Sequence, residues 1–307
     1  MMKRMISLVL VLGLVFFLTS SAYATLDIIW VSDAFTPAGD FAAGENVDPA
    51  LQGDDTPWDQ PWVDLLTAQG YNVDYTKGTS PGDGYWRSLD DDKIAALNAA
   101  DRVIVSRDTR SGDYGEDDEP SQWNSVTTPM ILMNPYFARS SRWKWFDTTG
   151  MAENGNAPLI DGAPPFDVVF TDLDVLDETV GTGNTSFVTA KDAGNGLAIA
   201  LVDDALPAAA EGGIDDLAGS ISLALWAEGV EFYNGAGQTA GGPRLYFAGG
   251  TREGDVEGGY FWGAGMYNLT ADGEAIFLAA VATIPEPATI ALLGLGGLAL
   301  LSIRRRR

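Results

Sequence analysis

The sequence predicts an α/β fold, a three-layer sandwich with a mostly parallel β-sheet between helices. In the first half of the chain, short apolar runs alternate with stretches of helical periodicity, a pattern typical of right-handed βαβ units. The chain has 307 residues, of which 46% are apolar and none is Cys. A core of this size forms without disulfide bonds, and no repeat of about 20–50 residues is visible in the sequence.

The first half contains the most regular elements. Trp58, Trp62 and Leu66 recur at helical spacing ahead of Gly70, which is a natural helix stop. Ser88 is placed to cap the next helix. In order, we expect a strand at 26–31, a helix at 58–69, a strand at 71–75, a helix at 88–100, and strands at 102–106 and 129–133.

The second half is less regular. It offers strands at 166–170, 197–202, 222–226 and 243–248, followed by a closing helix at 269–282. Asn268 or Thr270 would cap that helix, and Ile276, Phe277 and Ala280 would form its inner face. Long connections at 32–57, 107–122 and 171–196 separate the elements, and loops of this length are usually functional or disordered.

Composition excludes several classes of protein. The chain has 18 Lys and Arg against 43 Asp and Glu, a formal net charge of −25, which argues against nucleic-acid binding. It has neither Cys nor His. Thiolate nucleophiles, Ser-His-Asp triads and imidazole or thiolate metal ligands are therefore excluded.

The first 24 residues have the order of a secretory signal peptide. Lys3 and Arg4 precede an apolar run over 6–18, and small residues stand at Ala22 and Ala24. Signal peptidase is expected to cut after Ala24. The alternative is an uncleaved anchor, which the short apolar run disfavours, because a bilayer span needs roughly 20 residues.

The C-terminal end has the opposite polarity. Pro285, Glu286 and Pro287 precede an uncharged run at Ala288–Ile303, which predicts a membrane helix, and then Arg304–Arg307. Arginines after a short apolar segment hold that end in the cytoplasm, so the preceding body lies outside. The two ends hold six of the 18 basic residues and one of the 43 acids, which leaves the body more acidic still.

Pro-Glu-Pro, an apolar span and a basic terminus in this order resemble the PEP-CTERM sorting signal of bacterial surface and secreted proteins. The resemblance implies that residues 285–307 are held in the inner membrane and cut near Pro285–Pro287 by exosortase, a membrane protease. Residues 25–284 then form an extracytoplasmic domain that ends at the cell surface or outside the cell, in bacteria that make exopolysaccharide. A C-terminal anchor that is never cut is the alternative.

The body resembles the class I glutamine amidotransferase-like fold and its ThuA-like relatives. The likeness is carried by "AQG", "LNAADRVIVSRD", "TPMILMNP" and the closing "YNLTADGEAIFLAAV", and it implies a flavodoxin-like three-layer sandwich. That family places a Cys nucleophile in the turn after the strand that matches 130–133, with a His and a Glu. Here the turn reads Met133-Asn134-Pro135. The resemblance therefore implies a non-catalytic copy or a rebuilt site.

Polar residues follow three of the expected strands. They are Asp33, Ser106, Arg107, Asp108 and Asn134. Because ligands of open α/β sheets bind beyond the carboxyl ends of the strands, these five residues are the candidates for a ligand crevice. The alternative is that they only cap strand ends.

An acidic run is the candidate metal site. Asp113, Glu116, Asp117 and Asp118 supply the hard oxygen ligands that Ca²⁺ prefers, but not in the order of an EF-hand. A solvated acidic loop is the alternative. Asp172, Asp174 and Asp177 form a second, equally unspecific candidate. No other cofactor is indicated.

Trp143 and Trp145 alternate with Arg142 and Lys144, so one side of this segment is aromatic. Exposed rings would stack on sugars, whereas buried rings would fix the loop to the core. Three functions remain open: an exosortase-sorted protein that acts by binding or structure in an exopolysaccharide layer, a secreted carbohydrate hydrolase, and a Ca²⁺-dependent adhesion module. The hydrolase needs two carboxylates roughly 5–10 Å apart.

Overall fold

The computed structural model describes residues 25–77, 84–154, 158–160, 173–177, 179–181, 183–202, 217–255 and 258–283. The expected signal peptide at 1–24, the sorting signal at 285–307, the strand at 166–170 and Asp172 lie outside these residues. Within the described ranges, no helix combines the length and apolar character needed to cross a bilayer.

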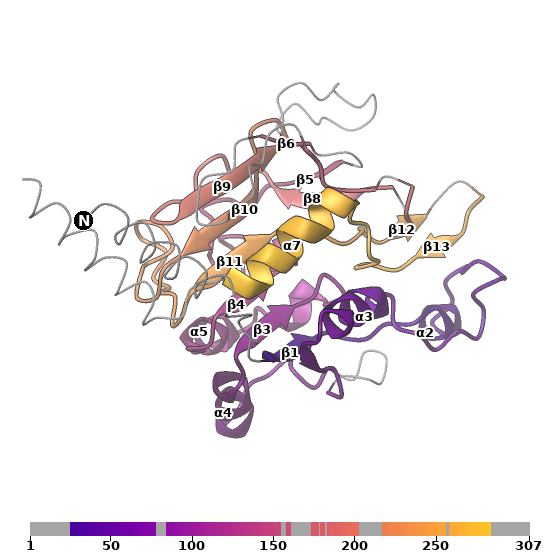
Figure 1. The fold of residues 1–307 in the computed structure, drawn as a ribbon, viewed down its shortest axis with the longest axis horizontal. Helices are drawn as coiled ribbons and strands as arrows, with labels where there is room; N and C mark the ends of the chain where they lie inside the picture. The colour runs from indigo at the N-terminus through magenta and orange to yellow at the C-terminus, as the bar shows by residue number, and fades with distance from the viewer. Residues whose placement is uncertain are drawn as a thin grey trace, which may run out of the picture.

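A mixed nine-stranded sheet runs through the molecule in the order β2-β1-β3-β4-β11-β10-β9-β6-β7 (Figure 1). Its strands are β1 (Asp27–Val31), β2 (Asn72–Asp74), β3 (Arg102–Val105), β4 (Met130–Leu132), β6 (Pro158–Ile160), β7 (Leu173–Asp174), β9 (Leu197–Val202), β10 (Ile221–Trp226) and β11 (Arg244–Phe247). From β2 to β11 neighbouring strands are parallel, and from β11 to β7 they are antiparallel. Only β10 and β6 oppose the common direction, so the prediction of an α/β fold with a large, mostly parallel sheet is confirmed.

The remaining elements are helices and two small strand pairs, and all of them are short except α3, α4 and α7. The helices are α2 (Pro37–Ala42), α3 (Gln60–Ala68), α4 (Asp91–Ala99), the 3-10 turn η1 (Ser111–Asp113), α5 (Glu119–Ser125), α6 (Pro135–Ala138) and α7 (Ala271–Thr283). Two small antiparallel pairs join β5 (Met151–Asn154) to β8 (Thr185–Val188) and β12 (Gly254–Asp255) to β13 (Phe261–Trp262).

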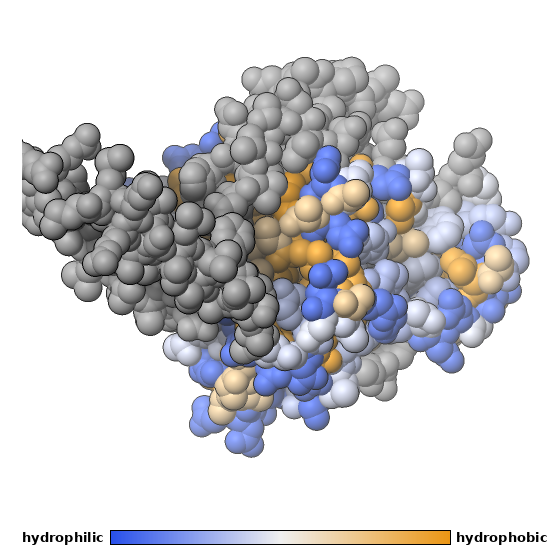
Figure 2. Space-filling view, in the orientation of Figure 1, coloured by the Kyte–Doolittle hydropathy of each residue, from blue (hydrophilic) through white to orange (hydrophobic). Residues whose placement is uncertain are grey.

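The helices lie on both faces of the parallel strands (Figure 1). From β1 the chain passes through α3 to β2, and then through α4 back to β3 on the opposite side of β1. Because such crossovers are right-handed, α3 and α4 lie on opposite faces, and α5 shares the face of α4. Helix α7 lies beside α3, where Trp62 meets Phe277 edge-on with ring centroids 5.1 Å apart. Figure 2 shows apolar side chains over α7 and mostly hydrophilic ones around α4.

Two helix starts test the capping predictions. Thr270 caps α7 by accepting a hydrogen bond from the Gly273 N–H at 3.2 Å. Ser88 was the wrong cap for α4, because Asp90 accepts the Lys93 N–H at 2.8 Å and the helix begins at Asp91. The predicted inner face of α7 is confirmed, since Ile276, Phe277 and Ala280 are buried.

The tryptophan segment is part of the core. Trp143 stacks on Trp123 with centroids 5.0 Å apart, and Trp145 stacks on Phe232 at 5.4 Å. Both rings are fully buried. Their indole N–H groups donate to the carbonyl oxygen of Tyr114 and the side chain of Asn124. The two rings therefore fix the loop after α6 to the core and offer no surface to a sugar.

Candidate functional site

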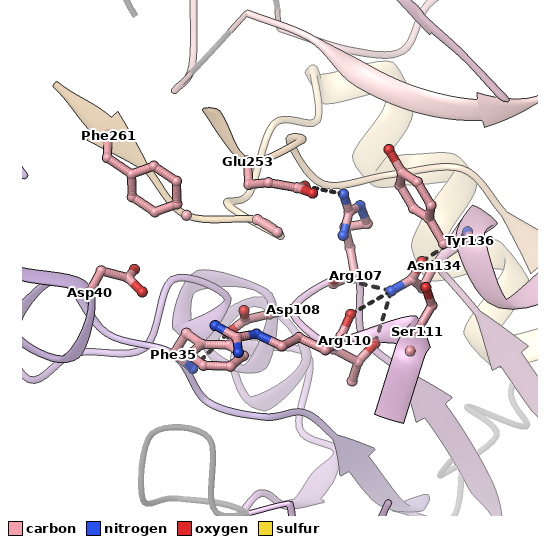
Figure 3. A pocket seen from close by; sticks show the side chains of 14 residues that line it. Phe35, Asp40, Arg107, Asp108, Arg110, Ser111, Asn134, Tyr136, Glu253 and Phe261 are labelled. Atoms are coloured by element: carbon pink, nitrogen blue, oxygen red, sulfur yellow. Dashed lines mark hydrogen bonds and ion pairs between the residues drawn. The ribbon is translucent and has the colours of Figure 1, made fainter. Parts of the chain in front are cut away.

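The molecule has a pocket at the carboxyl edge of its parallel strands. The chain first adds β2 on one side of β1 and then adds β3 and β4 on the other side, so a topological switch point lies between β1 and β3. Open α/β sheets bind ligands at such a point. A cavity of about 340 Å³ lies there, beyond the ends of β1, β3, β4 and β11 (Figure 3). Among the residues that line it are Phe35, Asp40, Arg107, Asp108, Arg110, Asn134, Tyr136, Glu253 and Phe261.

Three of the five predicted crevice residues line this pocket. They are Arg107, Asp108 and Asn134. Asp33 and Ser106 do not line it, and both are fully buried. The expectation that all five side chains face one crevice is therefore wrong for two of them, because their polar atoms are taken up by neighbours within the fold.

Asp33 organises the loop that follows β3. Its Oδ2 accepts the backbone N–H of Arg110 at 2.9 Å, and its Oδ1 accepts the Tyr114 hydroxyl at 3.1 Å. Arg87 forms an ion pair with the same carboxylate at 3.3 Å. These three partners hold the side chain under the pocket and set the position of the Arg110 backbone.

Ser106 belongs to a second buried network. Its hydroxyl donates to Asp59 Oδ2 at 2.7 Å and accepts the Asp108 N–H at 2.9 Å. Asp59 also accepts the Trp30 indole N–H at 2.8 Å and the Tyr75 hydroxyl at 2.9 Å. Burial raises the pKa of Asp59, while the hydrogen bonds from Ser106, Trp30 and Tyr75 act in the opposite direction.

Asp108 is a buried acid at the pocket wall. One of its carboxylate oxygens accepts the backbone N–H of Phe35 at 3.0 Å. Burial raises the pKa of Asp108 well above its usual value, and the nearby carboxylates of Asp59, Asp33 and Asp40 raise it further. This carboxyl group therefore keeps its proton to a higher pH than an exposed Asp does.

Asn134 stands in the turn after β4, where the resembled enzymes carry their nucleophile. Its amide nitrogen donates to the carbonyl oxygen of Thr109 at 2.8 Å and to the Thr109 hydroxyl at 3.0 Å. Its Oδ1 accepts the Tyr136 N–H at 2.9 Å and so caps α6. Asn134 ties the loop after β3 to the start of α6, which is a positioning role.

Arg107 and Glu253 form an ion pair across the pocket (Figure 3). Arg107 is buried, and its guanidinium carbon lies 4.9 Å from the centroid of the Tyr136 ring. Partial burial of Glu253 acts to raise the pKa of its carboxyl group, but attraction to Arg107, the hydrogen bonds to the carboxylate and the charge of Arg252 together outweigh this and leave that pKa below its usual value. Glu253 therefore stays ionised while Asp108 tends to hold a proton.

The opposite wall combines Arg110, Phe35 and Asp40. Arg110 lies over the Phe35 ring with its guanidinium carbon 4.5 Å from the centroid. Asp40, in α2, accepts the Trp58 indole N–H at 2.5 Å. Burial raises the pKa of Asp40, while this hydrogen bond and the charge of Arg110 lower it.

The acidic run gives no preassembled metal site. Asp113 forms an ion pair with Arg87 at 3.2 Å, and Glu119 starts α5. Across the part of the chain that the structure describes, no three carboxylates gather in a way that could hold a metal ion. This applies to the expected set Asp113, Glu116, Asp117 and Asp118, and the structure gives that set no support.

Sequence reasoning missed six of the pocket residues named above. Phe35, Arg110 and Tyr136 each follow a predicted residue by two positions. Glu253 follows the predicted strand at 243–248, so the rule that pointed to the ends of β1, β3 and β4 pointed to this segment too. Asp40 and Phe261 lie farther from any predicted strand end, where the sequence carries no such signal.

The comparisons with known proteins concern only the C-terminal end. No curated protein and no solved structure matches this chain, so the amidotransferase-like resemblance of the body has no relative behind it. Residues 283–307 match the model of the PEP-CTERM protein-sorting motif. The chain thus carries the sorting signal that exosortase processes, and this signal indicates an exported cell-surface protein.

Proposed function

We propose that this chain is a surface protein whose extracytoplasmic α/β domain binds a saccharide in the carboxyl-edge pocket, in an exopolysaccharide-associated layer, without catalysing a reaction. The observation that carries the proposal is the composition of the pocket wall. The rings of Phe35, Tyr136 and Phe261 stand around the ionic groups of Arg107 and Glu253 (Figure 3).

That composition suits a sugar. A pyranose ring has apolar C–H patches, which pack on aromatic faces, and hydroxyl groups, which need directional partners. The carboxyl groups of Asp40, Asp108 and Glu253 supply such partners around the rings. The cavity of about 340 Å³ is at the small end of the range for ligand sites, so it suits one or two sugar rings.

Two observations support binding without catalysis. Asn134, in the place of the resembled nucleophile, uses both ends of its amide within the fold. Ser106 has a carboxylate, Asp59, as its hydrogen-bond acceptor, and the chain has no His to serve as base.

The strand order β2-β1-β3-β4-β11 is that of flavodoxin-like domains, which supports the proposal of such a fold.

Export is proposed to involve two cuts. Signal peptidase would remove the residues up to Ala24, and exosortase would cut near Pro285–Pro287 after a stage in the inner membrane. Mass spectrometry of the protein recovered from the cell surface tests this directly. A mature chain that still ends at Arg307 would overturn the second cut.

Binding is tested on a panel of immobilised neutral and acidic glycans. Tyr136→Ala removes a ring from the pocket and should weaken binding by about tenfold or more. Tyr85→Ala is the matched control, because this ring is exposed and packs on Trp86 away from the pocket. If no glycan binds, or if both variants bind like the wild type, the proposed function is wrong.

A carbohydrate hydrolase is the second candidate. It is favoured by one observation: the surroundings push the pKa of Asp108 up and that of Glu253 down, and both residues line the same pocket. Such a divergent pair is the arrangement that an acid and a base require. Release of reducing ends by the wild type, lost in both Asp108→Asn and Glu253→Gln, would favour this function over binding alone.

A further inference from the structure

We infer that the saccharide bound in this pocket carries a carboxylate, as a hexuronate residue does, and that Arg107 and Arg110 bind that carboxylate. This inference rests on the proposed function and specifies its ligand. It is built from the partners of the two guanidinium groups, from the charge around them and from their geometry.

Arg110 is an exposed cation at the pocket wall whose backbone and side chain are both held in place. Its backbone N–H is fixed by Asp33, and its guanidinium group lies over the Phe35 ring. Within the described residues, this exposed side chain makes no hydrogen bond or ion pair. A guanidinium group stacked on a ring keeps its in-plane N–H groups available, so Arg110 can donate to an anion that enters the pocket.

Arg107 adds a buried donor without a partner. The residue is 4% exposed, and its Nε has no hydrogen-bond acceptor within the described part of the chain. Leaving such a buried donor unpaired is energetically unfavourable. The terminal nitrogen Nη2 is paired with Glu253, but Nε remains to be satisfied. Because Nε has no exposed surface of its own, the Arg107 side chain has to shift for a carboxylate in the pocket to accept from it.

The pocket, with two arginines and three carboxyl groups, is less acidic than the protein as a whole. With 18 basic residues against 43 acidic ones, two arginines at one small pocket are a strong local concentration. Burial also raises the pKa of both Asp40 and Asp108, which reduces the negative charge that the wall presents. The ionised Glu253 is already paired with Arg107.

A carboxylate fits these groups better than a sulfate or phosphate ester. It is planar, like the guanidinium group, and accepts two parallel hydrogen bonds from it. It also brings a single negative charge into a wall that holds three carboxyl groups. The remainder of a hexuronate ring has the hydroxyl groups and C–H faces that the proposed sugar site accommodates.

The test combines changes in the ligand with changes in the protein. Binding of methyl hexuronosides of the gluco, galacto and manno series is measured by calorimetry, beside their methyl esters, the neutral hexosides and the 6-sulfates. The full purified chain is used as wild type and as Arg110→Gln. Lys93→Gln is the matched control, because it removes the same charge from a cation stacked on a ring, Tyr85, outside the pocket.

We expect the wild type and Lys93→Gln to bind at least one hexuronoside about tenfold or more tighter than its ester. In Arg110→Gln this preference should shrink to about threefold or less. If the ester or the neutral hexoside binds as tightly as the acid, the inference is wrong and the proposed function stands. Tighter binding of the 6-sulfate overturns the choice of a carboxylate. If no sugar binds, both are wrong.

Glu253→Gln tests the role of Arg107, and in this variant the preference for acid over ester should increase, whereas it should decrease in Arg110→Gln. Removing the competing carboxylate frees Arg107, so the preference for acid over ester should rise, by about threefold. A loss of affinity shared equally by acid, ester and neutral sugar would report only the hydroxyl contacts of Glu253 and would leave the ratio of acid to ester affinity unchanged. An unchanged ratio would show that Arg107 does not contact the carboxylate, and this result overturns the role of Arg107.

Discussion

The two edges of the parallel strands bury different ionisable groups, arginines at the amino edge and mainly aspartates, beside Arg107, at the carboxyl edge. At the amino edge, Arg102 and Arg244 begin β3 and β11, and both are buried. At the carboxyl edge, the buried charged groups include Asp33, Asp59 and Asp108. The edges differ in what these groups contact, and that difference separates the part of the fold that supports stability from the part that offers a site.

The arginines of the amino edge are bound to backbone carbonyl oxygens. Arg244 donates to the carbonyl oxygens of Asn124 and Val126 at the end of α5, and to that of Thr128. Arg102 donates to the carbonyl oxygen of Val281 in the last turn of α7. Helix C-termini carry unpaired carbonyl groups and partial negative charge, so buried cations stabilise them.

The acids of the carboxyl edge are bound to side-chain and loop donors, and they leave space above them. Asp33 and Asp59 accept hydrogen bonds from tyrosine hydroxyls, and the Asp108 carboxyl group accepts the backbone N–H of Phe35. The pocket lies directly beyond these groups. The buried arginines of the amino edge thus satisfy carbonyl groups at helix C-termini, whereas the buried acids of the carboxyl edge fix the positions of loops around the pocket.

The largest expected effect is at the amino edge. Arg244→Met should lower the free energy of unfolding by about 4 kcal/mol, because it leaves buried carbonyl groups without donors. Urea denaturation of the purified chain measures this. Arg252→Met is the control, since Arg252 and its partner Glu153 are both about one-third exposed, and it should cost about 1 kcal/mol or less. Equal losses in the two variants would contradict the assignment.

At the carboxyl edge, Gly265 packs against the loop after β3. It has a φ of +88°, and a Cβ there would lie 2.8 Å from the Asp108 backbone nitrogen. Gly265→Ala should therefore lower the free energy of unfolding by about 3 kcal/mol. Gly259→Ala separates the strain of a positive φ from the steric clash of the new Cβ. Gly259 also has a positive φ, of +75°, but a Cβ there would meet open space. This substitution should cost about 1 kcal/mol.

The smallest expected effect is a difference in pH dependence. The folded pKa of Asp108 lies above its unfolded value of about 3.9. Its stabilising contribution is therefore complete below that unfolded pKa and is lost as the pH rises through the folded pKa. Asp108→Asn should thus become more stable relative to the wild type from pH 5 to pH 7, by at most about 1.4 kcal/mol per pH unit.

The amino edge provides the contrast in the same urea series. Burial lowers the pKa of Arg244 only to about 9, so this group stays charged from pH 5 to pH 7. The difference between the wild type and Arg244→Met should accordingly not change over this range. A constant difference for Asp108→Asn as well would show that Asp108 is not the buried acid described above.

Much of the parallel half of the sheet could be predicted from the sequence. Apolar runs such as 26–31 and 102–106 are short, continuous and spaced by helical segments, and these local features are enough to identify β1 and β3. The short helices α2, α5 and α6 could not be found, because they have too few turns to show a helical period. The place of β11 between β4 and β10 depends on pairing over more than a hundred residues, which no local pattern records.

The candidate site divides in the same way. The sequence by itself determined the sorting signal and the general place of the pocket, because both depend on local order along the chain: a short motif, and polar residues after apolar strands. Only the tertiary structure decided that Asp33 and Ser106 turn inward while Arg110, Tyr136 and Glu253 face the pocket. Side-chain direction in loops is set by partners from distant segments, such as the Tyr114 hydroxyl for Asp33 and Asp59 for Ser106.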